Sequence, residues 1–231
     1  MKRIITIAAI LSIGIIVNAQ RTETRTLDGN FDKIEVFGKI EVELVKKKSE
    51  KIEIKADSDI SLDDIKVKLE DRTLKISMTS ELFDYQKKVQ IFVPYQELRV
   101  VEVSGGSDIR SQSTLEGDRI EFKASSGGNI YLSLKLNTID ARVAQGSLIV
   151  FDGSVDSQVV ESASGATYSA YDLNCGETHV SVSTGGKAKI KATEILKAKA
   201  TTKGWIGYQG NPGKKKINET LGGKVEVGQD G

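Results

Sequence analysis

The sequence predicts an all-β protein, a right-handed parallel β-helix whose N-terminal part is rich in strands but irregular. Three observations lead to this prediction. Apolar and polar residues alternate through most of the 231 residues, which is the pattern of half-buried strands. Small-residue corners that end in glycine recur every 19 to 21 residues from about residue 101 onward. No stretch has the apolar spacing of a long amphipathic helix.

Residues 1–19 have the features of a signal peptide. A positively charged start, Met1 to Arg3, precedes an apolar stretch from Ile4 to Val17, and small residues follow it. The stretch is shorter than the roughly 18 residues of a spanning helix, which disfavours an uncleaved anchor. It holds no cysteine, so a lipoprotein signal is absent. We expect cleavage before Gln20, which leaves residues 20–231 as an exported single β-helix domain with no membrane span.

The first half of this domain alternates without a regular repeat. Ile34 and Val36 lead through Gly38 into a second apolar run, which is similar to the later corners. Residues 67–76 predict a hairpin across Asp71-Arg72. We expect this half to cover an end of the solenoid or to form its earlier rungs.

The second half predicts regular rungs over about residues 98–210. Separate hairpins are the alternative, but they give no reason for a fixed repeat near 20 residues. In a solenoid each rung buries its inward column on the next rung, about 4.8 Å away. Glycine then recurs because it takes a positive φ without cost. The sixth corner, at Gly204, fits better if the register slips by one residue. The five clear corners are 101–106, 122–127, 141–146, 160–165 and 180–185.

Composition excludes several classes of protein. Lys and Arg number 33 and Asp and Glu 32, a balance that argues against a polybasic nucleic-acid binder. One cysteine and one histidine exclude a disulfide framework and a zinc site of clustered Cys and His. They also exclude most Ser/His/Asp and Cys/His catalytic centres, unless His179 is the base. We expect no cofactor and no metal, an exposed polar His179, and Cys175 as a small buried side chain.

Several segments carry a resemblance to a known family. They are residues 31–36, the Val101–Ile109 run, the spaced Ser-Gly-Gly corners and Gly210-Asn211-Pro212. With them the chain resembles, over roughly residues 25 to 227, the exported bacterial proteins called putative auto-transporter adhesins with a head GIN domain. The resemblance implies a right-handed β-helix and export. None of the shared segments is a catalytic signature.

The candidate binding surface is the strip of small residues at the corners. Stacked hydroxyl groups there form a flat ladder that an extended polysaccharide could contact at the rung spacing. The alternative is that these residues are small only because the corner is tight. Another set is aromatic and consists of Trp205, Tyr208 and the earlier Tyr131. These side chains could stack on a sugar ring, or they could cap the core. The candidate ligand-binding residues are Ser104, Ser125, Ser126, Ser164, Ser183, Thr184, Trp205 and Tyr208.

Two other sets of charged residues have weaker functional interpretations. An outward ladder could form the carboxylate pair of a glycosidase, but ion pairing between neighbouring rungs explains it more simply. Asp57-Ser58-Asp59 resembles part of a calcium loop, but it lacks the glycine of that motif, and a turn between strands is favoured. The ladder consists of Glu102, Lys123, Arg142 and Glu161, flanked by Glu121 and Asp140.

The sequence therefore predicts an exported, non-catalytic adhesin that binds a polysaccharide or a cell-envelope surface. One alternative is a periplasmic scaffold with a protein partner, including self-association through the solenoid ends. A carbohydrate-active enzyme is the less favoured alternative. The location stays open between the periplasm, the outer cell surface and the extracellular space.

Overall fold

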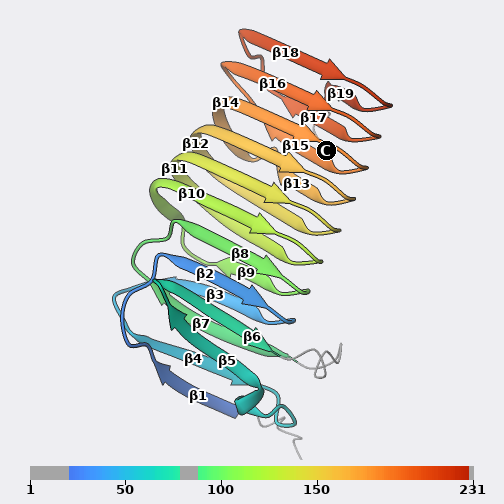
Figure 1. The fold of residues 1–231 in the computed structure, drawn as a ribbon. Coiled ribbons are helices and arrows are strands. Elements are labelled where there is room, and N and C mark those ends of the chain that lie inside the picture. Colours follow the sequence, from blue (N-terminus) through green and yellow to red (C-terminus); the bar gives the residue numbers. More distant parts are fainter. Residues whose placement is uncertain (1–20, 79–87, 229–231) are drawn as a thin grey trace, which may run out of the picture.

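The computed structural model describes residues 21–78 and 88–228 and shows an all-β protein (Figure 1). Residues 100–227 wind into a β-solenoid of about seven turns. The chain runs along the near face of Figure 1, turns, returns along the far face and climbs one rung, which makes the solenoid right-handed. The predicted right-handed parallel β-helix is confirmed. The predicted signal peptide lies outside the described residues.

Two flat faces meet at the predicted corners, and neighbouring rungs pair in parallel on both. β11 and β12 are long enough to run from the far face round to the near face. The near face holds β8 (Val100–Ser104), β10 (Leu115–Ala124), the ends of β11 (Asn129–Val143) and β12 (Leu148–Ser162), β14 (Leu173–Val182), β16 (Ile195–Ala200) and β18 (Lys214–Glu219). The far face holds β9 (Asp108–Ser111), the starts of β11 and β12, β13 (Thr167–Ala170), β15 (Lys187–Lys191), β17 (Trp205–Gln209) and β19 (Lys224–Val227).

The core fills the space between the faces with the residues that the repeat assigned to inward columns. The columns that begin with Val101, Val103 and Ile109 are buried in every predicted rung. Aromatic side chains form a stack within it. The ring centroids of Phe122 and Phe151 lie 4.7 Å apart, and those of Phe151 and Tyr168 lie 5.9 Å apart.

A polar network also lies inside the solenoid, and sequence reasoning did not predict it. The Tyr168 hydroxyl donates to Gln158 Oε1 at 2.7 Å. Gln158 Nε2 donates to Thr178 Oγ1 at 2.9 Å, and Thr178 Oγ1 donates to the Lys191 carbonyl at 3.0 Å. Each of these buried polar groups thus has a partner, which removes the cost of burying it.

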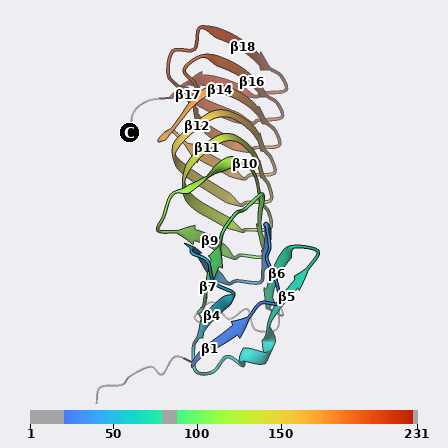
Figure 2. The same ribbon diagram turned by 90° about the vertical axis from the view of Figure 1, so that its left-hand side faces the viewer.

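The remaining N-terminal strands form a curled mixed sheet below the solenoid (Figure 2). Its central strand pairings are antiparallel, because β4 pairs with both β1 and β7 in that way. β5 and β6 form the predicted hairpin, in which Asp71 and Arg72 have φ values of 47° and 60°. These elements are β1 (Arg21–Thr26), β4 (Lys51–Ala56), the 3₁₀ turn η1 (Leu62–Asp64), β5 (Ile65–Glu70), β6 (Thr73–Met78) and β7 (Val89–Tyr95).

One rung lies out of sequence order. β2 (Lys33–Phe37) pairs in parallel with β6 on one side and with β8 on the other. β3 (Glu41–Lys46) likewise pairs with both β7 and β9. The rung-like corner predicted at Gly38 is therefore a real rung, inserted between segments that come later in the chain (Figure 1). The first half thus both covers the end of the solenoid and contributes a rung to it.

No helix in the described part of the chain is long and apolar enough to cross a membrane.

Candidate functional site

Each corner of the solenoid is a four-residue turn whose two central residues have positive φ. At the second corner Ser126 and Gly127 have φ values of 50° and 76°, and the Gly128 N–H donates to the Ser125 carbonyl at 3.0 Å. This geometry is that of a type I′ turn. The glycine of each of the five clear corners takes the expected positive φ, and the residue before it does so too, which was not predicted. At the sixth corner the pair is Thr202-Lys203, which confirms the slip of one residue.

Backbone packing explains the glycine that ends two of the corner turns. The Gly127 N–H donates to the Gln145 carbonyl of the next rung at 3.2 Å, and the later corners repeat this bond. A Cβ atom at Gly128 would lie 2.7 Å from the Val103 carbonyl oxygen, and one at Gly186 would lie equally close to that of Ser162. This close approach explains why the last residue of these two turns is glycine, without invoking a ligand.

The predicted hydroxyl residues do lie side by side on the corners. Ser126, Ser164 and Thr184 occupy the same exposed turn position in different rungs, and the Ser126 hydroxyl donates to Gln145 Oε1 at 3.0 Å. We call this exposed line the corner ridge. The second predicted column, Ser104, Ser125 and Ser183, is only half-exposed beside it.

The two predicted aromatic residues of β17 lie on opposite sides of the sheet. Trp205 faces outward and is half-buried, and its Nε1 donates to Glu226 Oε1 at 2.6 Å. Tyr208 is 7% exposed and belongs to the core. The outward partner of Trp205 is instead Tyr171, because a Cβ atom at Gly207 would lie 2.2 Å from the Tyr171 hydroxyl and 2.4 Å from the Trp205 ring. Tyr131 lies apart, with the Arg110 guanidinium 4.4 Å from its ring centroid.

The outward charge ladder is a set of ion pairs between neighbouring rungs. Glu121 is paired with Lys123, at 3.2 Å, and with Arg142 of the next rung. Arg119 Nε donates to Asp140 Oδ2 at 3.0 Å. The simpler interpretation of the ladder therefore has direct support, since each of these two carboxylates has a basic partner.

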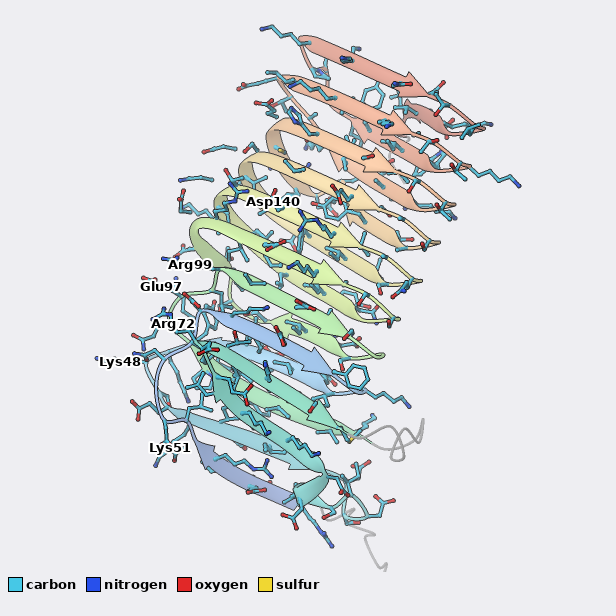
Figure 3. The ribbon with its side chains drawn as sticks, in the orientation of Figure 1. Lys48, Lys51, Arg72, Glu97, Arg99 and Asp140 are labelled. Atoms are coloured by element: carbon cyan, nitrogen blue, oxygen red, sulfur yellow. The ribbon has the colours of Figure 1, made fainter. Side chains whose placement is uncertain are left out.

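A charged groove, which we call the lateral groove, opens beside this ladder and was not predicted. Residues 96–99, between β7 and β8, form one wall, and β10 with the end of β11 forms the other. Its volume is about 910 Å³. Figure 3 shows Glu97, Arg99 and Asp140 along this side of the molecule. Its basic residues are Lys46, Arg99, Arg119 and Arg142, and its acidic residues are Glu97, Glu116, Asp118, Glu121 and Asp140.

The walls of the groove are held from both halves of the chain. The Arg99 N–H donates to the Asp32 carbonyl at 2.7 Å, which ties the 96–99 segment to the residue that precedes β2 of the inserted rung. Lys46 Nζ lies 3.1 Å from Glu116 Oε2 and joins β3 to β10. The sequence signalled only one wall, through Glu121, Asp140 and the ladder. The facing residues come from a segment without any repeat.

The remaining polar candidates have ordinary partners. His179 Nε2 lies 2.7 Å from Glu177 Oε1 on the outer surface. Asp57 Oδ2 accepts the Lys88 N–H at 2.9 Å, as expected for a turn between strands. Within residues 21–78 and 88–228 no three His, Cys, Asp or Glu side chains form a group that could hold a metal ion.

Cys175 is buried, and this leads to a prediction about its reactivity. Burial raises the pKa of the Cys175 thiol to about 11, and its Sγ donates to the Glu177 carbonyl at 3.1 Å. Only the thiolate is nucleophilic, and at pH 8 it amounts to roughly one thiol in a thousand. The native chain should stay unmodified by a disulfide reagent at pH 8 while the urea-unfolded chain reacts at once. Equal rates for the two forms would contradict the buried position.

The fold and these surfaces place the chain in the class of parallel β-solenoid proteins that present a repeated outer surface. Residues 30–212 match the family described as "Putative auto-transporter adhesin, head GIN domain", and the chain belongs to this family. The predicted resemblance is thereby confirmed. Membership of this family implies export. No curated protein matches the chain in sequence.

Solved structures share the fold over nearly the whole chain. A putative adhesin from Bacteroides fragilis is 17% identical with a TM-score of 0.79, covering 91% of this chain and 98% of that one. A putative lipid binding protein from Parabacteroides distasonis is 18% identical with a TM-score of 0.72, covering 91% and 97%. A putative adhesin from Parabacteroides merdae is 20% identical with a TM-score of 0.67, covering 91% and 96%. Neither the family description nor these names mention a catalytic activity.

Proposed function

We propose that this chain is an exported, non-catalytic adhesin that binds an extended ligand, a polysaccharide or another component of a cell-envelope surface. Its family and the two solved putative adhesins support this role. Signal-peptide cleavage before Gln20 and action in the periplasm, at the outer surface or outside the cell belong to the same proposal.

The lateral groove is the observation that carries the proposal. Ligand sites are concave and place a few polar groups where they fix the orientation of the ligand. Arginine donates hydrogen bonds in a planar fork, and carboxylates accept them, whereas sugar hydroxyls do both. Arg99, whose side chain is 75% exposed, faces a wall in which Arg119 and Asp140 are already oriented by their ion pair. A sugar chain lying in this groove would meet preorganised donors and acceptors.

The corner ridge is the second place where the ligand could lie. Ser164 and Thr184 are exposed in adjacent rungs, and Ser126 is exposed two rungs before Ser164, with Gln145 between them. The ridge projects, whereas ligand sites are concave, so we expect it to contribute less than the groove.

A binding screen with matched variants tests both surfaces. The exported chain is applied to an array of bacterial and host glycans, with intact producer cells as a parallel target. Arg99→Gln combined with Arg119→Lys keeps a positive charge beside Asp140 but removes the guanidinium forks. This variant should lose at least ~10-fold in affinity, because a hydrogen bond to a charged group contributes about 1.5–3 kcal/mol. Ser126→Ala combined with Ser164→Ala is the control and should change affinity less than about 2-fold, since neutral hydroxyls contribute less.

Each other outcome rejects part of the proposal. A larger loss in the serine variant would move the ligand to the corner ridge. Binding to cells with a blank array would favour the scaffold with a protein partner. Release of reducing ends from a polysaccharide would favour the enzyme. No binding to either target would reject the adhesin role for this chain.

A further inference from the structure

The charge of the solenoid changes sign along its axis. Residues 101–180 hold eleven acidic and five basic residues, a net charge of −6. Residues 187–228, which we call the C-terminal tip, hold ten lysines and three glutamates, a net charge of +7. The tip comprises β15 to β19, the orange-to-red end of the molecule in Figure 1. The overall charge of +1 therefore conceals a strongly basic end.

The lysines of the tip lack the ion pairs found elsewhere on the solenoid. Four of the five basic residues between 101 and 180 lie within 4 Å of a carboxylate. Among the ten lysines of the tip, only Lys197 lies that close to a described carboxylate, at 3.8 Å from Glu177. Lys189 contacts the Tyr171 ring, with 5.8 Å from its Nζ to the ring centroid. The positive charge of the tip is thus largely uncompensated within the described chain.

The lysines surround the tip rather than line one face. Strand alternation turns Lys197 and Lys199 outward on the near face, and Lys187 and Lys189 outward on the far face. Lys203 stands at the corner between the two faces. The last rung adds Lys214, Lys215, Lys216 and Lys224. A linear polymer along one face would meet only part of this ring, whereas a planar anionic surface approached end-on would meet the lysines of β18 and β19, with those of β16 one rung behind.

Apolar side chains are exposed in the last rung of the same tip. The described residues include five exposed large hydrophobic side chains, and three of them belong to the last rung: Leu221 at 78%, Val227 at 68% and Ile217 at 44%. Leu221 also has a φ of 50° at the turn position that holds Gly, Ser, Gln or Thr in the earlier corners of the solenoid. Leucine is unusual at positive φ, and here burial in the core does not compensate it.

Stacking of a second solenoid on this end is disfavoured by two side chains. Lys215 and Glu219 of β18 continue the inward columns of Leu196 and Ala200. A further rung placed above them would bury both charges, and charges that point inward are a common protection of sheet edges. Contact with a flat surface, by contrast, would leave Lys215 and Glu219 among polar groups at that surface instead of burying them.

We propose that the C-terminal tip docks end-on onto an anionic lipid bilayer. The lysine ring contacts the lipid phosphates, and Leu221, Ile217 and Val227 enter the boundary between headgroups and acyl chains. Exposed lysines near an anionic leaflet and apolar side chains that enter the interface contribute jointly to such binding. The lateral groove lies outside the tip, so the adhesin could hold its ligand while docked.

Vesicle co-sedimentation of the exported chain tests this proposal. Vesicles of phosphatidylglycerol and phosphatidylcholine in equal parts should bind the chain, pure phosphatidylcholine should not, and added salt should weaken binding. The variant with Lys199→Gln, Lys214→Gln and Lys216→Gln should bind at least ~10-fold more weakly. Leu221→Asn should also lower binding several-fold without unfolding the corner, because asparagine accepts positive φ.

The matched control carries the same loss of charge at the other end of the molecule. Lys47→Gln, Lys48→Gln and Lys51→Gln lie beside the N-terminal sheet, where Figure 3 labels Lys48 and Lys51, and should leave binding unchanged. Arg99→Gln should also leave it unchanged, which separates this proposal from that of the groove. Absence of binding to anionic vesicles, or an equal loss in the control, would overturn the proposal. Tip-dependent binding of soluble polygalacturonate, or a tip-dependent dimer, without vesicle binding would overturn it in favour of that partner.

Discussion

Gly153→Ala is expected to lower the free energy of unfolding by about 3 kcal/mol or more, from roughly 1–3 kcal/mol of backbone strain and a similar cost of overpacking. Gly153 lies within β12, where its φ of 105° is a conformation that side chains rarely adopt. A Cβ atom there would lie 2.1 Å from the Leu134 carbonyl oxygen of the rung below. That contact involves backbone, so one of the two rungs must shift. Guanidinium unfolding followed by far-UV circular dichroism measures the loss.

Gly146→Ala is the matched control for this prediction. Gly146 also has a positive φ, 70°, but a Cβ atom there has no other atom within 4 Å. Its substitution should therefore lower the free energy of unfolding by only about 1 kcal/mol, the cost of holding an alanine at positive φ. If Gly153→Ala costs no more than Gly146→Ala, close stacking of the rungs does not limit that position.

Phe151→Ala is the second change with a large expected effect, a loss of about 3–5 kcal/mol. The Phe151 ring is 1% exposed and touches aromatic rings of two other rungs, Phe122 and Tyr168. Removing it leaves a cavity at the centre of the stack that the surrounding ladders cannot close without breaking hydrogen bonds. Equilibrium unfolding, with Trp205 fluorescence as a second probe, measures the cost.

Phe37→Ala provides the comparison for the aromatic stack. Phe37 is 46% exposed at the end of β2, so much of its surface is already in water. We expect its truncation to cost less than half as much as that of Phe151. Equal costs would mean that the stack is not the main source of the stability around Phe151.

The regular half of the fold was predictable because its signal is local. Each rung carries its own turn residues, and the columns beginning at Val101 and Ile109 recur in register with them. The one-residue register slip at the sixth corner was visible because Ala198 and Ala200 did not fall in the inward columns when Gly204 was aligned with the earlier glycines. The burial of Cys175 was predictable for the same reason, since alternation along one strand assigns a face to each residue.

The parts that were not predicted depend on contacts between distant segments. Nothing near Ile34 or Val42 specifies that their rung lies between β6 and β8, because that position depends on which edges remain open. The lateral groove needs Arg99 from an irregular segment to face Asp140 from the repeat. Gln158 looks like a surface residue until its partner Tyr168 is placed on the opposite face of the same rung.

The inserted rung has a consequence for the order in which the chain can fold. Because β2 and β3 need β6 and β7 on one side and β8 and β9 on the other, their ladders stay incomplete until residue 111 is available. An emerging chain therefore cannot assemble this solenoid rung by rung from its N-terminus, as a simple repeat array could. Pairing of β2 and β3 with β6 and β7 must bring together segments far apart in the chain, with β4, η1 and β5 between them. This closure carries an entropic cost that local pairing would avoid, so assembly of this junction should be slow. Once closed, the junction ties the first rungs of the solenoid to the N-terminal sheet, so that neither can fray without the other.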